Sequence, residues 1–168
     1  MGFHSLKDVL QEQLEDLHSA ETQLVAALPK MAQAASNDQL RDAFRHHLEE
    51  TRGHLKRVED ALGELGVSHP TEVCKGMKGL VAEGEEMIAK PGDAMAKDAA
   101  LIGAAQRVEH YEIAGYGTAR QLADDCGFDG IRDLMDQTLD EESQADKLLT
   151  KIATGGMFKA GINRQATA

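Results

Sequence analysis

The stretch IGAAQRVEHYEIAGYGTARQLA, residues 102–123, decides the fold that this sequence predicts. Every third or fourth residue belongs to one face, which reads Ile102, Ala105, Glu109, Glu112, Tyr116, Ala119, Ala123. This period keeps one side of a helix toward a partner. Two acidic residues lie within the face, and a buried carboxylate is costly unless it is paired, protonated or bound to metal. The stretch therefore predicts a bundle helix that carries acidic groups into the interior.

Two other stretches repeat the pattern, each with one acidic residue in the apolar face. The first face is Leu10, Leu14, Leu17, Glu21, Leu24, Leu28, Met31. The second is Ile131, Met135, Thr138, Glu142, Ala145, Leu149, Ile152. Three such helices point to a metal site inside a bundle.

Composition agrees with an all-α protein of one domain. The chain has 168 residues, 42% of them hydrophobic, with no Trp and only three Pro. A formal net charge of −11 disfavours nucleic acid and anionic membranes as partners. The two cysteines form no zinc or disulfide framework. There is no apolar run of about 20 residues and no signal peptide, so we expect a cytoplasmic protein.

Capping and turn residues divide the chain into two helical hairpins. The first pairs a helix from Ser5 to about Ala35 with one from Asp38 to Gly66. The second pairs a helix from residues 93–97 to 125 with one over 131–154. A crossover, about 67–97, joins them and contains a short helix that Thr71 caps. This is the ferritin-like four-helix bundle with one long crossover, over residues 1–155. The tail, 156–168, is expected to be flexible.

Counting residues outward from the two hairpin turns predicts that acidic residues of neighbouring helices lie at the same height along the bundle. Glu21 in the first hairpin and Glu112 in the second lie at matching heights, because antiparallel helices rise equally per residue. Each faces a pair four residues apart on the next helix, Glu50 with His54 and Glu142 with Asp146. The arrangement predicts a dinuclear site. Glu50 and Glu142 would bridge two metal ions, and Glu21, His54, Glu112 and Asp146 would be terminal ligands.

The ligand set departs from the usual pattern of Glu-x-x-His in helices two and four. The spacing here is four, and Asp146 stands where a second histidine is common. Oxygen-rich ligands favour iron, with manganese or zinc as alternatives. Glu109 is a further candidate ligand that could move between the metals. Tyr116 and His47 are candidates for hydrogen bonding to ligands.

Ordinary roles compete with these assignments. Glu49, Asp140 and Glu141 are interpreted as solvated surface charges, and His46, His69 and His110 as ordinary helix histidines. Pairing of buried glutamates with Arg52 or Arg107 is the alternative to metal binding.

Several motifs resemble the YciE/YciF family of bacterial stress-associated proteins. They are Leu48-Glu49-Glu50-Thr51, Asp98-Ala99-Ala100-Leu101-Ile102, Val108-Glu109-His110-Tyr111-Glu112-Ile113, Glu141-Glu142 with Asp146, and Ser19-Ala20-Glu21-x-Gln23-Leu24. The resemblance covers nearly the whole chain except the tail. It implies a ferritin-like, rubrerythrin-like fold, a homodimer and a dinuclear metal centre, and it supports Glu109 as an extra ligand.

Three functions follow from these expectations. The first is a di-iron protein of stress defence that handles peroxide or oxygen. The chain lacks the four-cysteine iron site that relays electrons in rubrerythrins, so an external reductant would be needed. The second is a metal-binding or interaction scaffold without turnover, and the third is iron storage in a cage.

Overall fold

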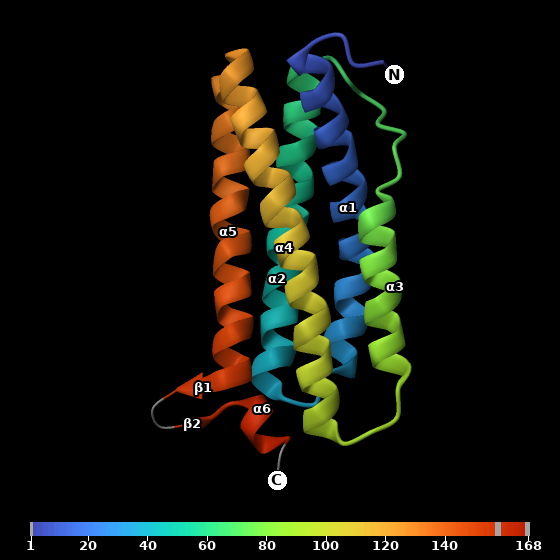
Figure 1. Ribbon diagram of the computed structural model, residues 1–168, viewed down its shortest axis with the longest axis vertical. Helices are drawn as coiled ribbons and strands as arrows, with labels where there is room; N and C mark the ends of the chain where they lie inside the picture. The colour runs from blue at the N-terminus through green and yellow to red at the C-terminus, as the bar shows by residue number, and fades with distance from the viewer. Residues whose placement is uncertain (1, 157–158, 167–168) are drawn as a thin grey trace.

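Five helices of 15 to 33 residues make up most of the computed structural model, which describes residues 2–156 and 159–166. They are α1 (Leu6–Ala34), α2 (Asp38–Glu64), α3 (Lys75–Ala89), α4 (Ala94–Cys126) and α5 (Asp129–Thr154). Helices α1 and α2 form one antiparallel hairpin, and α4 and α5 form the other (Figure 1). The crossover helix α3 packs on α1 and α4 at the outside of the bundle. The all-α, ferritin-like prediction is confirmed.

Side-chain caps begin α1, α2, α3 and α4 at or near the predicted positions. Ser5 and Asp8 form a capping box, in which the Ser5 hydroxyl accepts from the Asp8 amide and the Asp8 carboxylate accepts from the Ser5 amide. Two predicted caps are displaced. Asn37 rather than Asp38 caps α2, and Cys74 rather than Thr71 caps α3.

The turn between α1 and α2 is held by a residue from the other hairpin. Asp98 of α4 is fully buried, and its carboxylate accepts the backbone amides of Ser36 and Asn37 at 2.9 and 2.7 Å. Hydrogen bonds satisfy this buried charge. They also fix the end of one hairpin against the start of the other.

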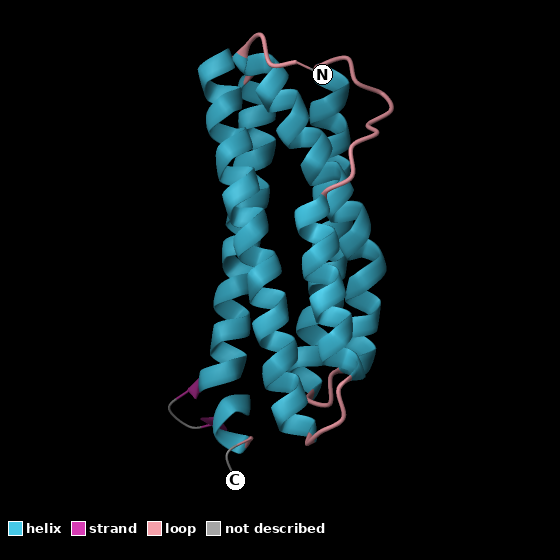
Figure 2. Cartoon of the chain, turned by 45° about the vertical axis from the view of Figure 1, so that its right-hand side comes forward, coloured by secondary structure: helices cyan, strands magenta, loops and turns pink. Residues whose placement is uncertain are grey.

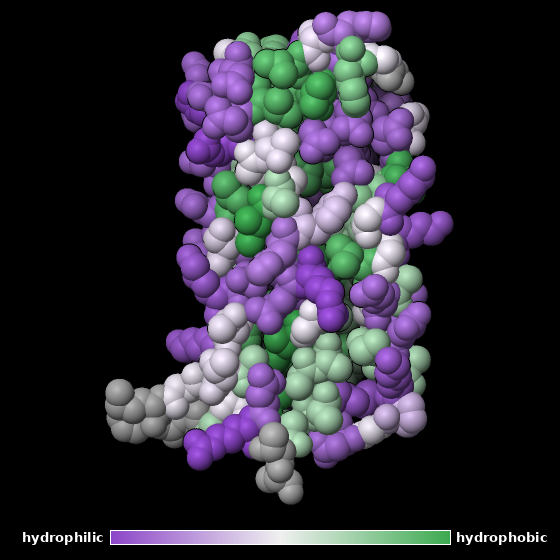
Figure 3. Space-filling model, in the orientation of Figure 1, coloured by the Kyte–Doolittle hydropathy of each residue, from purple (hydrophilic) through white to green (hydrophobic). Residues whose placement is uncertain are grey.

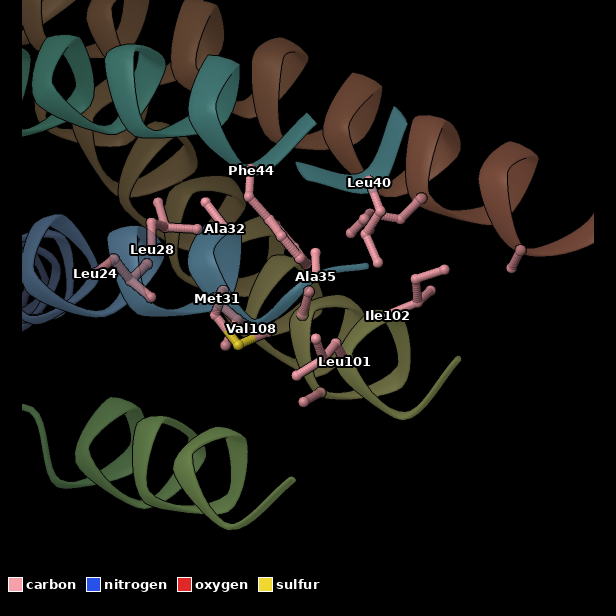
Figure 4. Close-up of a cluster of buried hydrophobic side chains, with 14 of the residues drawn as sticks. Leu24, Leu28, Met31, Ala32, Ala35, Leu40, Phe44, Leu101, Ile102 and Val108 are labelled. Carbon is pink, nitrogen blue, oxygen red and sulfur yellow. The ribbon is translucent and has the colours of Figure 1, made fainter. Parts of the chain in front are cut away.

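Two apolar clusters fill the bundle, one toward each end. One contains Leu10, Leu14 and Leu17 of α1 with side chains of α2, α4 and α5. The other begins at Ala20 and Leu24 and includes residues near the opposite end of the bundle (Figure 4). The boundary between them falls at the level of Glu21.

The sequence predicts a flexible tail over 156–168, and the described residues of that segment include short regular elements. After α5, strands β1 (Gly155–Gly156) and β2 (Lys159–Ala160) pair antiparallel, and α6 (Ile162–Gln165) follows (Figure 2). Ile162 is buried in the apolar cluster near Leu101 and Leu149. Burial of this side chain is the physical reason that the described part of the tail lies against the bundle.

The outer surface carries both hydrophilic and hydrophobic side chains (Figure 3). On the face drawn in Figure 3, hydrophilic side chains alternate with smaller hydrophobic patches. None of the described helices combines the length and apolarity that a bilayer crossing requires.

Candidate metal centre

Six buried acidic and histidine side chains from four helices meet between the two apolar clusters. They are Glu21 of α1, His47 and His54 of α2, Glu109 and Glu112 of α4, and Glu142 of α5. Each is at most 6% exposed. Five were predicted as ligands, and the sixth, His47, was predicted only as a hydrogen-bonding neighbour.

The six side chains form two adjacent groups that share one residue. The first group is Glu21, His54 and Glu142, and the second is His47, Glu109, Glu112 and Glu142. Within each group, one ligand atom per residue lies within 4.8 Å of all the others. Glu142 therefore stands between two places where a cation could be held.

The position of His47 follows from the buried face of α2. That face runs Leu40, Phe44, His47, Thr51, His54, Val58 and Ala61. It steps by threes and fours like the faces of α1, α4 and α5, and it brings His47 and His54 into the interior two turns apart. Thr51, not Glu50, is the counterpart of Glu142, because each follows the acidic residue of its preceding helix, Glu21 or Glu112, by 30 positions.

Glu50 and Asp146 lie outside both groups, so the structure does not gather the predicted ligand set as a whole. Glu50 follows His47 at the edge of the interior, with its side chain 26% exposed and its Oε2 3.4 Å from His47 Nδ1. Asp146 is turned by about 40° from Glu142 on the helix and is shorter by one methylene. It accepts from Gln106 of α4 at 3.0 Å and lies 3.3 Å from His110.

Many buried polar atoms of the six residues lack hydrogen-bond partners. Among the described residues, eight buried side-chain atoms are unsatisfied, and all belong to Glu21, His47, His54, Glu109, Glu112 and Glu142. Both carboxylate oxygens of Glu112 and of Glu142 are in this set. Proteins rarely leave such atoms unpaired. Unpaired oxygens and imidazole nitrogens facing one another fit a bound cation, which would satisfy them together.

His54 is oriented from outside the centre by Glu141. The Nε2 atom of His54 lies 2.9 Å from Glu141 Oε2, and the same carboxylate is paired with Arg57. This leaves the Nδ1 atom facing Glu142 and Glu21, at 2.8 and 3.5 Å. A carboxylate behind a histidine is a common support for metal ligands. The prediction that Glu141 is a solvated surface charge is therefore wrong. Its side chain is 27% exposed and is bonded to His54, Arg57 and Gln137.

Tyr116 supports the other side of the first group. It is fully buried, and its hydroxyl donates to Glu21 Oε1. The bond leaves Glu21 Oε2 as the free oxygen of that carboxylate. Tyr116 thus fixes the direction in which Glu21 presents its ligand atom, as the sequence suggested for a tyrosine one turn after Glu112.

The two histidines are surrounded by carboxylates. Burial disfavours the charged imidazole of His54, but its contacts with Glu142 and Glu21 outweigh burial and raise its pKa to about 10. For His47, burial is likewise outweighed by Glu109 and by neighbouring carboxylates, and the pKa rises to about 9. Without metal, both imidazoles are therefore cationic at neutral pH.

The buried glutamates differ in the direction in which their pKa is shifted. Burial raises the pKa of Glu112 well above its usual range, and the charge of Glu142 adds to the shift. Burial also raises the pKa of Glu109 well above its usual range, although His47 opposes it. For Glu142, burial is outweighed by His54 and His47, so its pKa is lowered. Without metal, these shifts favour the ionised form of Glu142 and the protonated form of Glu112.

The described residues thus form a buried His and Glu cluster that can bind a metal ion. The donors are carboxylate oxygens and imidazole nitrogens, with no thiolate in either group. Buried Glu–Arg pairing was the alternative interpretation, but no arginine contacts the six residues in the hydrogen bonds and ion pairs of the described chain. Arg57 reaches the cluster indirectly, through its pairing with Glu141.

Comparison with known proteins agrees with this fold and places it in a family. The chain is 41% identical to Protein YciF of Escherichia coli strain K12 over 165 residues, which cover 98% of this chain and 99% of that protein. The crystal structure of the E. coli stress protein YciF superposes with a TM-score of 0.85, over 89% of this chain and 94% of that one. YcfI from Rhodopseudomonas palustris, 36% identical, gives a TM-score of 0.86 over 89% and 96%.

A protein of Xanthomonas campestris, at 20% identity and a TM-score of 0.69, shares the fold alone. Residues 5–166 match DUF892, a domain of unknown function. Since the match covers nearly the whole helical bundle and the YciF resemblance covers the same residues, this chain is a YciF-like member of the DUF892 family.

Proposed function

We propose that the protein is a dinuclear, iron-binding carboxylate protein of the bacterial stress response that reacts with peroxide or oxygen. The observation that carries the proposal is the set of eight unpartnered buried atoms on two groups that share Glu142. Two adjacent groups with one common carboxylate suit two cations. The similarity to the E. coli stress protein YciF supports the physiological setting.

The donor set favours iron. The two groups offer four carboxylates and two imidazoles, which suit iron and manganese and also accept zinc. In the refined ligand set, His47 joins Glu21, His54, Glu109, Glu112 and Glu142. Glu50 contacts His47 at the edge of the centre, whereas Asp146 contacts Gln106 and His110, outside both groups.

Bound as two ferrous ions, iron would supply two electrons that, with two protons, reduce one hydrogen peroxide to two waters. The chain's residues prepare this chemistry. Glu141 holds His54 with Nδ1 toward the centre, and Tyr116 holds Glu21. The apolar clusters on either side exclude bulk water, which strengthens the electrostatic interactions inside. Glu112, protonated without metal, must give up its proton to bind a cation.

Turnover requires a separate electron donor. The chain has two cysteines, Cys74 just before α3 and Cys126 at the end of α4, so it has no four-cysteine relay. We propose that a small redox protein returns two electrons, one at a time, to the ferric centre. We also propose that the protein works as a homodimer, as its resemblance to the family implies. Mass photometry separates a dimer from a storage cage.

Metal analysis and anaerobic titration test the function. Protein purified without chelator should contain about two iron ions per chain, as the two groups indicate. Ferrous-loaded protein should gain ferric absorption when peroxide is added. Glu142→Gln should lose both the metal and the absorption change, whereas Glu83→Gln on the exposed side of α3 should keep them.

A metal that raises the melting temperature without any peroxide-dependent absorption would instead indicate a structural or scaffold role. Metal content in Glu142→Gln equal to that of the wild type would contradict the site itself.

A further inference from the structure

An apolar cavity beneath α3 reaches the metal centre from one side of the bundle. Its walls come from α1, α3 and α4 and include Leu28, Met31, Val81, Ile88, Ala105 and Val108. Met31 and Val108 belong to the cluster drawn in Figure 4. The cavity ends inward at His47 and Glu109, two members of the second ligand group.

The outer end of this cavity lies at the surface. Lys30 of α1 and Glu85 of α3 line it there, and their charged ends pair at 2.6 Å. Their side chains are 58% and 50% exposed, respectively. An exposed ion pair of this kind is weak and readily opens. The cavity therefore connects the surface to the buried pair of His47 and Glu109.

A second cavity reaches the same pair between α2 and α5. It is larger, about 230 Å³, and its lining includes His46, Glu50 and Gln144. It shares only His47 and Glu109 with the first cavity. Because α3 packs on α1 and α4, the two cavities approach the centre from different sides. One approach is apolar and the other carries hydrogen-bonding and charged groups.

Size and lining restrict what the apolar cavity can take up. Its volume is about 40 Å³, roughly three times what a single water needs and far below the several hundred Å³ typical of organic ligands. Along its apolar walls, a hydrogen-bonding molecule would lose its water partners without replacement, at a cost of about 1–3 kcal/mol per group. A small molecule that makes no hydrogen bonds has no such cost.

We propose that the cavity beneath α3 is the access route of dioxygen to the metal centre, and that hydrogen peroxide and other polar species pass between α2 and α5. This inference rests on the proposed function and assigns each oxidant its own route to the centre. With two ferrous ions bound, dioxygen takes two electrons and two protons to give hydrogen peroxide, and both ions become ferric.

Gly84 provides a variant that blocks the cavity. It lies on its wall, and a Cβ atom added there would meet only Met31 Sδ at 3.9 Å, an ordinary contact. Gly84→Leu should therefore fold and place its side chain in the cavity. Gly79→Leu is the matched control, because it lies on the exposed side of the same helix and a Cβ there meets nothing within 4 Å. Both variants gain the same helix propensity.

Xenon binding tests the cavity without any metal. Crystals of metal-free protein under xenon pressure should show a xenon atom among Met31, Val81 and Val108, since small apolar cavities bind this gas. The atom should remain in Gly79→Leu and disappear in Gly84→Leu. Absence of xenon from the wild type, or its persistence in Gly84→Leu, would overturn the proposal even if the metal chemistry is correct.

Stopped-flow oxidation of the ferrous-loaded proteins tests which oxidant enters through the cavity. Gly84→Leu should slow oxidation by dioxygen about tenfold, which is about 1.4 kcal/mol in barrier, and should leave oxidation by peroxide unchanged. Gly79→Leu should change neither rate. Equal slowing of both oxidants would contradict the separate routes. If no variant or wild type is oxidised at all, the proposed function fails, and the xenon result still decides whether the cavity admits an apolar gas.

Discussion

The Nδ1 atom of His54 and the Oε1 atom of Glu142 lie 2.8 Å apart, yet neither makes a hydrogen bond of acceptable alignment. The two atoms, on helices α2 and α5, are close without being aligned for a hydrogen bond. Such a geometry is expected where two ligands converge on a cation. It makes this pair the most direct structural indication of the centre.

The ligand set can be tested by separating interior from edge residues. His47→Gln and Glu109→Gln should each lower the metal content, because both side chains are buried in the second group. Glu50→Gln and Asp146→Asn should keep wild-type metal content, since both lie outside the groups. Elemental analysis of the four purified variants measures this. Loss of metal in Glu50→Gln with full metal in His47→Gln would restore the ligand set that the sequence predicts.

Metal binding should release protons at neutral pH. Metal ligation needs neutral imidazole and ionised carboxylate, whereas His54 has a pKa of about 10 and the pKa of Glu112 is raised well above its usual range. Calorimetry in buffers of different ionisation enthalpy should detect about two or more protons released per loaded chain. His54→Gln should release about one fewer proton, and His46→Gln, an exposed control, should match the wild type. No difference between His54→Gln and the control would contradict the assignment.

The stability of the metal-free protein should fall as the pH rises. The folded-state pKa values of His47 and His54 are raised to about 9 and 10, above about 6.5 for an unfolded histidine. Their stabilising contribution is therefore complete below about pH 6.5 and is lost as the pH rises through 9 to 10. Denaturant titrations from pH 6 upward, with chelator present, measure the effect. A stability that is flat or rising over this range would exclude the carboxylate-held imidazolium ions.

Glu112→Leu should stabilise the metal-free protein while abolishing metal binding. Glu112 is fully buried with both oxygens unsatisfied, and an apolar side chain of similar size removes that cost, about 1–3 kcal/mol. Chemical denaturation without metal measures the gain, and the metal-induced rise in melting temperature should vanish. Glu83→Leu on the exposed side of α3 should change the unfolding free energy by less than about 0.5 kcal/mol. Destabilisation by Glu112→Leu would show that the acid has a partner.

Glu141 should act on the metal through His54. Glu141→Gln keeps the size of the side chain but weakens its bonds to His54 and Arg57, so metal affinity should fall about 10- to 100-fold. Competition with a chromogenic chelator measures this. Asp140→Asn, at an exposed neighbouring position, should leave the affinity unchanged. Equal affinity in both variants would mean that Glu141 only stabilises the surface between α2 and α5.

The sequence predicted the fold and the four acidic residues of the centre because their helices carry a regular apolar face. Glu21, Glu109, Glu112 and Glu142 interrupt such faces, and an interruption of that kind is visible without a structure. His47 was not predicted as a ligand, because the buried face of α2 contains His47, Thr51 and His54 in succession and lacks a regular apolar pattern there. Register counting alone placed Glu50 and Asp146 at the right height, but height does not determine which way a side chain points.

Supporting contacts between residues far apart in the sequence could not be predicted from residue spacing. Glu141 and His54 are 87 residues apart, and no local pattern distinguishes Glu141 from a surface glutamate. The same holds for Asp98, which caps a turn 61 to 62 residues earlier in the chain. The tail was predicted to be flexible because its sequence lacks a helical period. A single side chain, Ile162, nevertheless reaches the apolar cluster.

The two apolar clusters, one on each side of the polar layer, bear on the order of events in the cell. Each cluster draws side chains from α1, α2, α4 and α5, so each end of the bundle is joined independently of the middle. The bundle can therefore fold without a cation in the polar layer. Any metal ion that the cluster holds would then bind to a chain that is already folded.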